Sequence, residues 1–133
     1  MNYFEPHLTP DELRAISAIG LAHMGDAVYE TLVRTCLCVH GKATGKELHR
    51  ATIALVCAQK QAELAQRVLP QLTEEELAVY KRGRNANVHA MPRSATPAQY
   101  HAATGLECLM GWLYLRGDKE RAEQLFHAMM EEE

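Results

Sequence analysis

Two acidic residues lie within otherwise apolar stretches of the sequence and are the first candidates for chemistry. Asp26 follows Gly25 in residues 21–29, and Glu107 lies in residues 102–112, which contain two more glycines. A carboxylate in such a stretch is costly to desolvate unless it is paired or binds a cation. Glycine permits close helix packing, so the two acids could meet, and Mg²⁺ is commonly held by one or two carboxylates with water and phosphate. The pair therefore indicates a magnesium site, while the residues alone also allow acids that are partly exposed or neutralised by arginine.

The second candidate feature is a basic segment between the two acids. Its members can contact a nucleic-acid backbone: Lys81, Arg82, Arg84, Asn85 and Asn87. A weaker basic group precedes it: Lys46, His49 and Arg50. Lysine and arginine neutralise phosphate charge, and asparagine donates to phosphate or ribose oxygens. A run of charges is more often a solvated surface, so the segment alone is weak evidence for nucleic-acid binding.

Other chemistries lack their motifs in this sequence. There is no Ser-His-Asp pattern, Gly-rich phosphate loop, H-E-x-x-H or paired E-x-x-H, which argues against P-loop nucleotide hydrolysis, zinc proteolysis and di-iron chemistry. Glu30, one helical turn after Asp26, and Thr104, one turn before Glu107, are candidates for supporting roles. His23 also lies within helical reach of Asp26, and we expect a structural or surface histidine there.

The elements that hold these residues are predicted to be helices. Capping patterns predict helix starts at Thr9, Thr44, Thr73, Thr96 and Asp118. Apolar periodicity predicts helices over residues 15–39, 44–55, 58–69, 73–82, 96–115 and 118–126. The second and third of these are predicted to form either one kinked helix or two. Residues 83–95 are rich in Gly, Asn, Pro and Ser and are predicted to form a loop. Without an alternating strand pattern, we expect an all-α single domain over residues 1–133.

The composition excludes several classes of protein. The 133 residues are 47% hydrophobic, enough for one core, and no apolar run reaches the roughly 18 residues of a membrane span. Residues 1–10 lack an apolar signal core, so we expect a cytoplasmic protein. The net charge of -3 counts mildly against nucleic-acid binding, although a local basic patch can still bind phosphate. Four cysteines without metal-binding spacing are expected to be free thiols: Cys36, Cys38, Cys57 and Cys108.

Three blocks of the sequence together resemble a known family. Residues 21–30 resemble the signature helix of the ribonuclease III catalytic domain, whose core is Gly-Asp followed by a small and an apolar residue. Residues 104–115 resemble the second acidic helix of that family. Residues 81–86, Lys-Arg-Gly-Arg-Asn-Ala, resemble a segment of its small bacterial branch, Mini-ribonuclease III. The spacing of the blocks fits this branch, and the resemblance covers residues 21–125.

The resemblance implies a magnesium-dependent homodimeric endoribonuclease with an all-helical fold and no separate double-stranded-RNA-binding domain. It implies cleavage of double-stranded RNA in the maturation of large-subunit (23S) ribosomal RNA, with a ribosomal protein as a candidate helper. Asp26 matches the signature aspartate and Glu107 the essential glutamate, which makes them the catalytic and metal-binding candidates. The RNA-binding candidates are then Lys81, Arg82, Arg84 and Asn85.

The sequence departs from the larger ribonuclease III enzymes at two acidic positions. Ala22 stands where they have a glutamate ligand, and Thr104 stands where they have an aspartate. The Mini branch shares this reduced set. Fewer protein oxygens predict more water or phosphate ligands and weaker metal binding, and they leave the number of ions open.

Two alternative functions predict different behaviour. A ribonuclease-III-like module that binds structured RNA without cutting it would lack the acids, whereas both are present here. A helical protein-interaction domain would use the acids structurally. It predicts no magnesium effect and no RNA binding.

Overall fold

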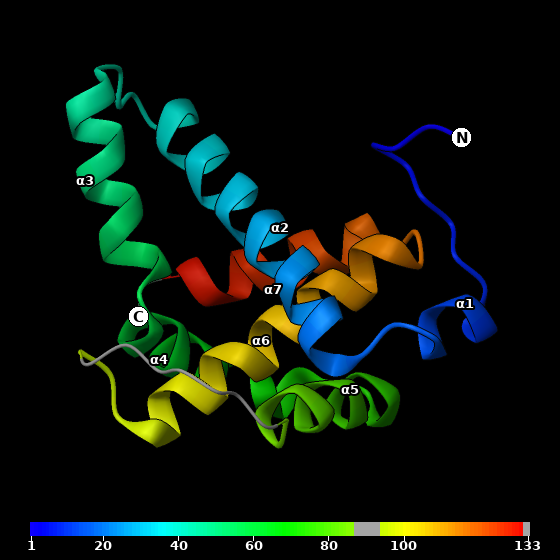
Figure 1. Cartoon of the computed structure of the whole chain (residues 1–133). Helices are drawn as coiled ribbons and strands as arrows, with labels where there is room; N and C mark the ends of the chain where they lie inside the picture. Colours follow the sequence, from blue (N-terminus) through cyan, green and yellow to red (C-terminus); the bar gives the residue numbers. More distant parts are fainter. Residues whose placement is uncertain (87–93, 132–133) are drawn as a thin grey trace.

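The computed structural model describes residues 1–86 and 94–131, which form α-helices and no strand (Figure 1). The predicted all-α class is therefore confirmed. The α-helices are α1 (Pro10–Arg14), α2 (Ala18–Val39), α3 (Gly45–Val56), α4 (Ala58–Val68), α5 (Glu74–Arg84), α6 (Pro97–Leu115) and α7 (Lys119–Met130). A short 3₁₀-helix, η1 (Leu69–Gln71), follows α4 and has no counterpart in the sequence prediction.

Capping side chains determine where most of these helices begin. Thr9, Thr44, Thr73 and Thr96 each accept a hydrogen bond from the backbone N–H three residues later, and the Glu or Gln at that position accepts one in return. Asp118 accepts from the third N–H that follows it. All five predicted caps are confirmed.

Two helix boundaries differ from the prediction at the ends of apolar runs. α2 begins at Ala18 rather than near residue 15, because Ser17 caps it through the backbone N–H of Gly20. α7 continues past Phe126 to Met130, because Met129 still packs in the core. Apolar periodicity located both helices and missed their ends by a few residues.

The basic segment belongs to α5 for most of its length, so the predicted loop start at Gly83 is wrong. α5 continues through Gly83 to Arg84. A Cβ on Gly83 would lie 2.5 Å from the Cβ of Cys108, so this glycine permits close packing of α5 on α6. Gly83, which predicted a helix end in the sequence, is therefore a point of close contact between α5 and α6.

Residues 44–69 contain two helices, which resolves the choice left open by the sequence. Cys57 has an extended backbone (ψ 153°) and separates α3 from α4. The last carbonyls of α3 need partners outside the helix. The Tyr29 hydroxyl donates to the carbonyl of Leu55, and the Gln61 amide donates to the carbonyl of Val56. Side chains from α2 and α4 thus hold the break in place.

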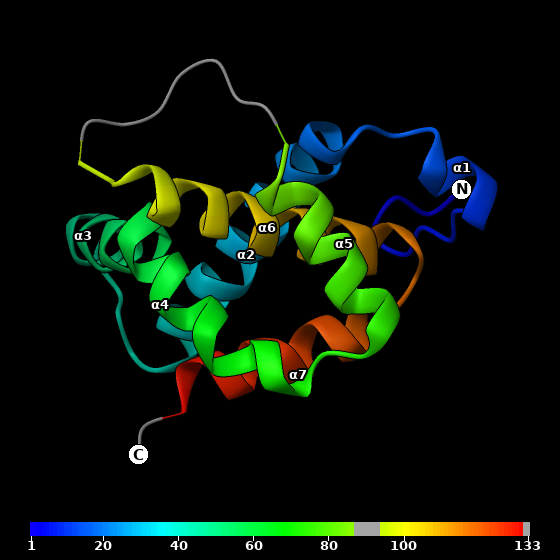
Figure 2. The ribbon, with the colours of Figure 1, turned by 90° about the horizontal axis from the view of Figure 1, so that it is seen from below.

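Helix α6 runs through the middle of the bundle, with α2, α4, α5 and α7 packed around it (Figures 1 and 2). Every residue from Ala102 to Leu113 is buried except Glu107, which is partly exposed. Glu107 is therefore the one residue between Ala102 and Leu113 that reaches solvent. No helix in residues 1–86 or 94–131 is long and apolar enough to cross a membrane.

Candidate active site

Asp26 and Glu107 come together where α2 packs against α6, as the glycines beside them suggested. A Cβ on Gly25 would lie 1.6 Å from the carbonyl oxygen of Glu107, and one on Gly111 would lie 2.0 Å from that of Leu21. The two backbones are therefore in direct contact. This contact places Asp26, the residue after Gly25, beside the carboxyl group of Glu107.

The two carboxyl groups have different surroundings. Burial raises the pKa of Glu107 to about 8, and the negative charge of Asp26 and a hydrogen bond with Asp26 contribute to the rise. Asp26 is exposed, which is one of the alternatives that the residues alone left open. The apolar face of α2 is turned towards the core through Leu21, Gly25 and Tyr29, which leaves Asp26 at the rim. Glu107 alone carries the cost of burial.

Gln61 on α4 is the third polar group of the site. It is 2% exposed, and its Nε2 donates to Oε2 of Glu107 at 3.2 Å and to the carbonyl of Val56 at 2.9 Å. Its Oε1 is buried and has no hydrogen-bond partner among the described residues. A buried amide oxygen in that state costs about 1–3 kcal/mol.

These side chains border a hollow of about 360 Å³ between α2, α4 and α6. Its lining consists of Asp26, Val56, Cys57, Ala58, Gln61, Ser94, Tyr100, Ala103, Thr104 and Glu107. The Thr104 hydroxyl donates to the carbonyl of Tyr100 and is therefore engaged within α6. Nearby, burial raises the pKa of Tyr29, so its phenol stays protonated at neutral pH and is no general base.

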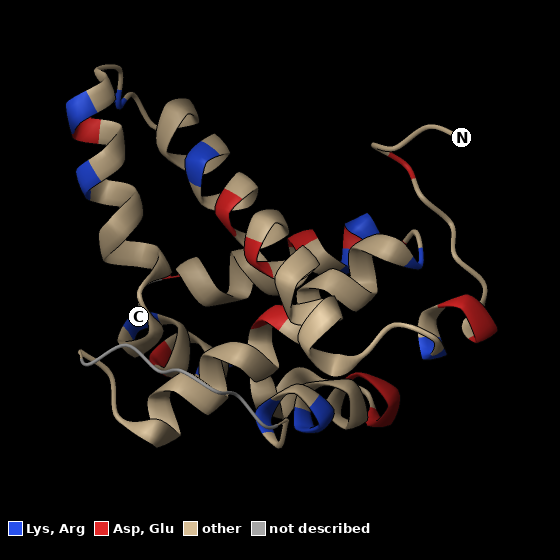
Figure 3. Cartoon of the chain, viewed as in Figure 1, with Lys and Arg blue, Asp and Glu red and all other residues tan. Residues whose placement is uncertain are grey.

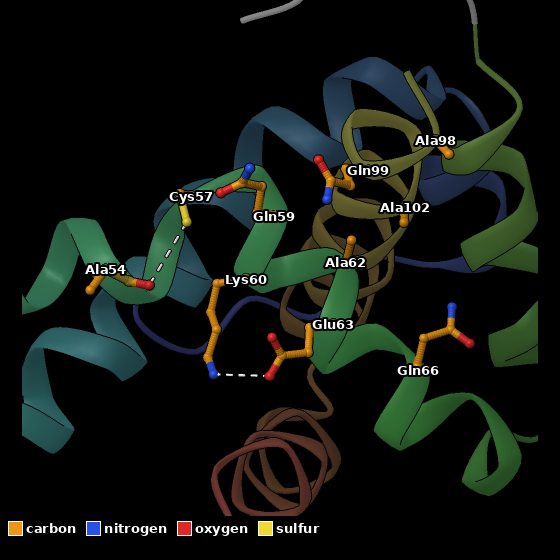
Figure 4. Close-up of a pocket in the computed structure, with 10 residues that line it drawn as sticks. All are labelled: Ala54, Cys57, Gln59, Lys60, Ala62, Glu63, Gln66, Ala98, Gln99 and Ala102. Carbon is orange, nitrogen blue, oxygen red and sulfur yellow. Dashed lines mark hydrogen bonds and ion pairs between the residues drawn. The ribbon is translucent and has the colours of Figure 1, made fainter. Parts of the chain in front are cut away.

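A larger hollow of about 580 Å³ lies beside the first, between α4 and the beginning of α6, and includes Cys57 in its lining (Figure 4). Its two charged lining residues, Lys60 and Glu63, form an ion pair at 3.1 Å. Glutamine and alanine side chains make up most of the remaining lining. Because its two charges are paired with each other and neither Asp26 nor Glu107 lines it, the smaller hollow is the candidate site.

The main basic group lies on the last turn of α5, where Figure 3 shows blue residues. Lys81, Arg82 and Asn85 are exposed. Arg84 is half-buried, with its guanidinium 5.9 Å from the centre of the Tyr80 ring and its Nε donating to Asn85. None of these four residues lines the hollow of the acids. Asn87, the last member predicted, is outside the described residues.

The supporting candidates are spread over three helices, α2, α3 and, for Thr104, α6. Lys46, His49 and Arg50 are exposed on α3 and do not line the hollow. Glu30 forms an ion pair with Arg34 one turn along α2, so its charge is already balanced. His23 is exposed, as expected, and lines a shallow hollow on α2 together with Asp26 and Glu30.

The donor set fits a weakly held hard divalent cation. Within residues 1–86 and 94–131, no group of three or more His, Cys, Asp or Glu residues could hold a metal ion. Two adjacent carboxylates meet the minimum that Mg²⁺ uses together with water and phosphate. Burial is the main cause of the raised pKa of Glu107, and a bound cation would relieve the repulsion from Asp26 that adds to it.

Sequence reasoning missed Gln61. It is one of several glutamines in a polar stretch, and no motif distinguishes it. Helical spacing could have done so, because Gln61 lies on the same face as Leu64, Ala65 and Val68, all of which are buried. A polar residue on an apolar face requires a partner.

Comparison with known proteins identifies the family that this chain matches. The Ribonuclease III domain family matches residues 20–118. The Mini-ribonuclease 3 of Symbiobacterium thermophilum is 45% identical over 110 residues, which cover 83% of this chain and 85% of that protein. The Mini-ribonuclease 3 of Enterococcus faecalis is 42% identical over 118 residues, covering 87% and 89%. A crystal structure of a Fusobacterium nucleatum protein superimposes with a TM-score of 0.79 at 30% identity, covering 86% of this chain and 93% of that one.

Proposed function

This chain belongs to the ribonuclease III family of endoribonucleases, in its Mini-ribonuclease 3 group, and from that premise we propose that it cleaves double-stranded RNA with Mg²⁺. The observation that carries the proposal is the pairing of Asp26 with Glu107 across the contact of α2 and α6. Both acids lie in residues 20–118, which match the family. We propose that residues 1–133 act as one catalytic domain.

Asp26 and Glu107 are proposed as the catalytic pair that holds the cation. Bound Mg²⁺ supplies the charge that activates water and neutralises the leaving 3′-oxygen. Asp26, exposed at the rim, would meet the cation and its water first. Glu107, held by Gln61 in the hollow, would close the site from the inner side. Attack of water on the phosphorus then gives 5′-phosphate and 3′-hydroxyl ends.

The RNA backbone is proposed to lie along α5. Lys81 and Arg82 present charges to solvent, and Arg84 is held next to Tyr80 and Asn85. Contacts of this kind read the shape and phosphates of an A-form duplex more than its sequence. None of these residues lines the hollow, so gripping and cutting would use separate groups of side chains. The exposed α3 group, Lys46, His49 and Arg50, would extend the grip.

The family premise leads to two proposals about partners. A twofold dimer would place two such sites to cut the two strands of one duplex. The substrate is proposed to be a precursor of 23S ribosomal RNA, with a ribosomal protein as a candidate helper. Purified protein on a precursor fragment, with and without large-subunit proteins, tests both the substrate and the helper.

The direct test of the proposed function is a labelled RNA duplex incubated with the protein in Mg²⁺ and in EDTA. We expect cutting in Mg²⁺ and no cutting in EDTA. The products should carry 5′-phosphate and 3′-hydroxyl ends, which a ligase can join. Cutting that persists in EDTA would contradict the metal mechanism. Binding without cutting in Mg²⁺ would favour a non-catalytic RNA-binding module, and neither binding nor cutting would favour a protein-interaction domain.

A further inference from the structure

Gln61 makes a contact with Glu107 that the proposed reaction does not by itself require. The side chain is 2% exposed, and its two donor contacts reach different helices. One goes to the last carbonyl of α3, at Val56, and the other to the Glu107 carboxyl group on α6. One amide group therefore connects α3, α4 and α6 at the edge of the hollow.

These two contacts determine the orientation of the Gln61 side-chain amide. A carbonyl and a carboxylate are both acceptors, so only the NH₂ end of the amide can face them. The Val56 carbonyl is itself fixed, because it ends α3 where the chain extends at Cys57. The amide is thus anchored on the backbone, and its remaining hydrogen is directed at Oε2 of Glu107.

The other end of the amide offsets part of the stability that its two hydrogen bonds contribute. Oε1 is buried without a partner among the described residues. An apolar side chain of similar volume would leave no such atom, although it would also leave the Val56 carbonyl without its donor. The gain and the loss in stability therefore offset each other in part, and the contact that a glutamine adds at the site is the donor that holds Glu107.

We propose that Gln61 is a positioning residue that fixes the Glu107 carboxylate in the orientation needed to bind the divalent cation. The proposal rests on the proposed function and deepens it. With two candidate carboxylates, the orientation of each matters, since no third acid within residues 1–86 and 94–131 completes the group. A hydrogen bond to one oxygen of a ligating carboxylate restricts its rotation and leaves the other oxygen for the ion.

The test measures cation binding to the RNA-free protein. Gln61→Met removes the amide and keeps a side chain of similar length. Mn²⁺, counted as free ion by electron paramagnetic resonance, serves as the probe. We expect the Kd for Mn²⁺ to rise about tenfold or more, as for loss of other partners of metal ligands. The matched control is Gln66→Met, the same change at an exposed position of the same helix, and it should leave the Kd unchanged.

A second measurement separates positioning from general damage. High Mg²⁺ should restore most of the kcat of Gln61→Met on an RNA duplex, because the ligands are intact and only less well oriented. It should not restore Asp26→Asn. The unfolding temperature of Gln61→Met should stay within about 4 °C of wild type. If this variant fails to fold, Gln61→Leu takes its place with the same expectations.

The results of these experiments distinguish failure of the positioning role of Gln61 from failure of the proposed function. An unchanged Kd for Mn²⁺ in a folded Gln61 variant would overturn the positioning role. A lowered kcat that high Mg²⁺ does not raise would overturn it as well. A wild-type protein that neither binds Mn²⁺ nor cuts duplex RNA would instead refute the proposed function, and it would be recognised before any variant is compared.

Discussion

The Cα of Gly25 lies so close to the backbone of Glu107 that a Cβ would be 1.6 Å from the Glu107 carbonyl oxygen. This backbone contact between α2 and α6 brings the two acids together. The glycine is thus part of the site, although it has no side chain to act with.

Gly25→Ala is expected to destabilise the protein by about 3 kcal/mol or more, because the methyl group meets backbone atoms that cannot move aside without separating the helices. Gly45→Ala is the control, since nothing lies within 4 Å of its added Cβ. Urea unfolding of the three proteins measures the difference. Equal stability of Gly25→Ala and wild type would show that the helices are not in backbone contact.

The free energy of unfolding is expected to depend on pH through Glu107. Its folded pKa is raised to about 8 from the ordinary 4.5, so the folded protein holds the proton more tightly than the unfolded chain. The stabilising contribution of Glu107 to the free energy of unfolding is therefore fully present below pH 4.5 and is lost as the pH rises to about 8. In EDTA, we expect a loss on the order of 3 kcal/mol after allowing for partial exposure.

Glu107→Gln should remove most of this pH dependence, because the amide cannot ionise and its oxygen can still accept from Gln61. Urea unfolding at pH 5 and pH 8 measures it in both proteins. Added Mg²⁺ should stabilise wild type at pH 8 and leave the variant unaffected. If the variant loses as much stability as wild type between these pH values, Glu107 is not the group responsible.

Arg84→Ala should weaken duplex RNA binding and reduce the slope of log K against log salt concentration by about one. The expected reason is the loss of one phosphate contact from the end of α5. Lys119→Ala, which removes a charge paired with Glu5 at the start of α7, is the matched control. Filter binding between low and moderate salt gives the slopes. An unchanged slope for Arg84→Ala argues against a phosphate contact there.

The sequence predicted the helix starts that carry caps and indicated that the two acids could meet. Capping threonines specify local hydrogen bonds, and glycine next to an acid specifies a close contact, so both can be inferred without coordinates. The continuation of α5 through Gly83 to Arg84 was not predictable in this way. Gly83 in a polar stretch indicates a loop, unless one knows that α6 lies against it.

The exposure of Asp26 and the role of Gln61 depend on tertiary packing. Asp26 lies among apolar residues in the sequence, yet the direction of its side chain depends on how α2 is rotated against α6. Gln61 lies 46 positions before Glu107, and no local rule connects them. Charges and caps follow from the sequence, whereas contacts between distant helices require the fold.

The central claim is that Asp26 and Glu107 together hold the cation that makes this chain a nuclease. The most direct measurement is the cleavage rate of an RNA duplex in Mg²⁺ by wild type and by Asp26→Asn, with RNA affinity and unfolding temperature measured alongside. We predict that the variant folds, binds RNA about as well as wild type and has lost cleavage by at least about a hundredfold, because one of two carboxylate ligands is gone. An Asp26→Asn protein that cuts at the wild-type rate would contradict the account.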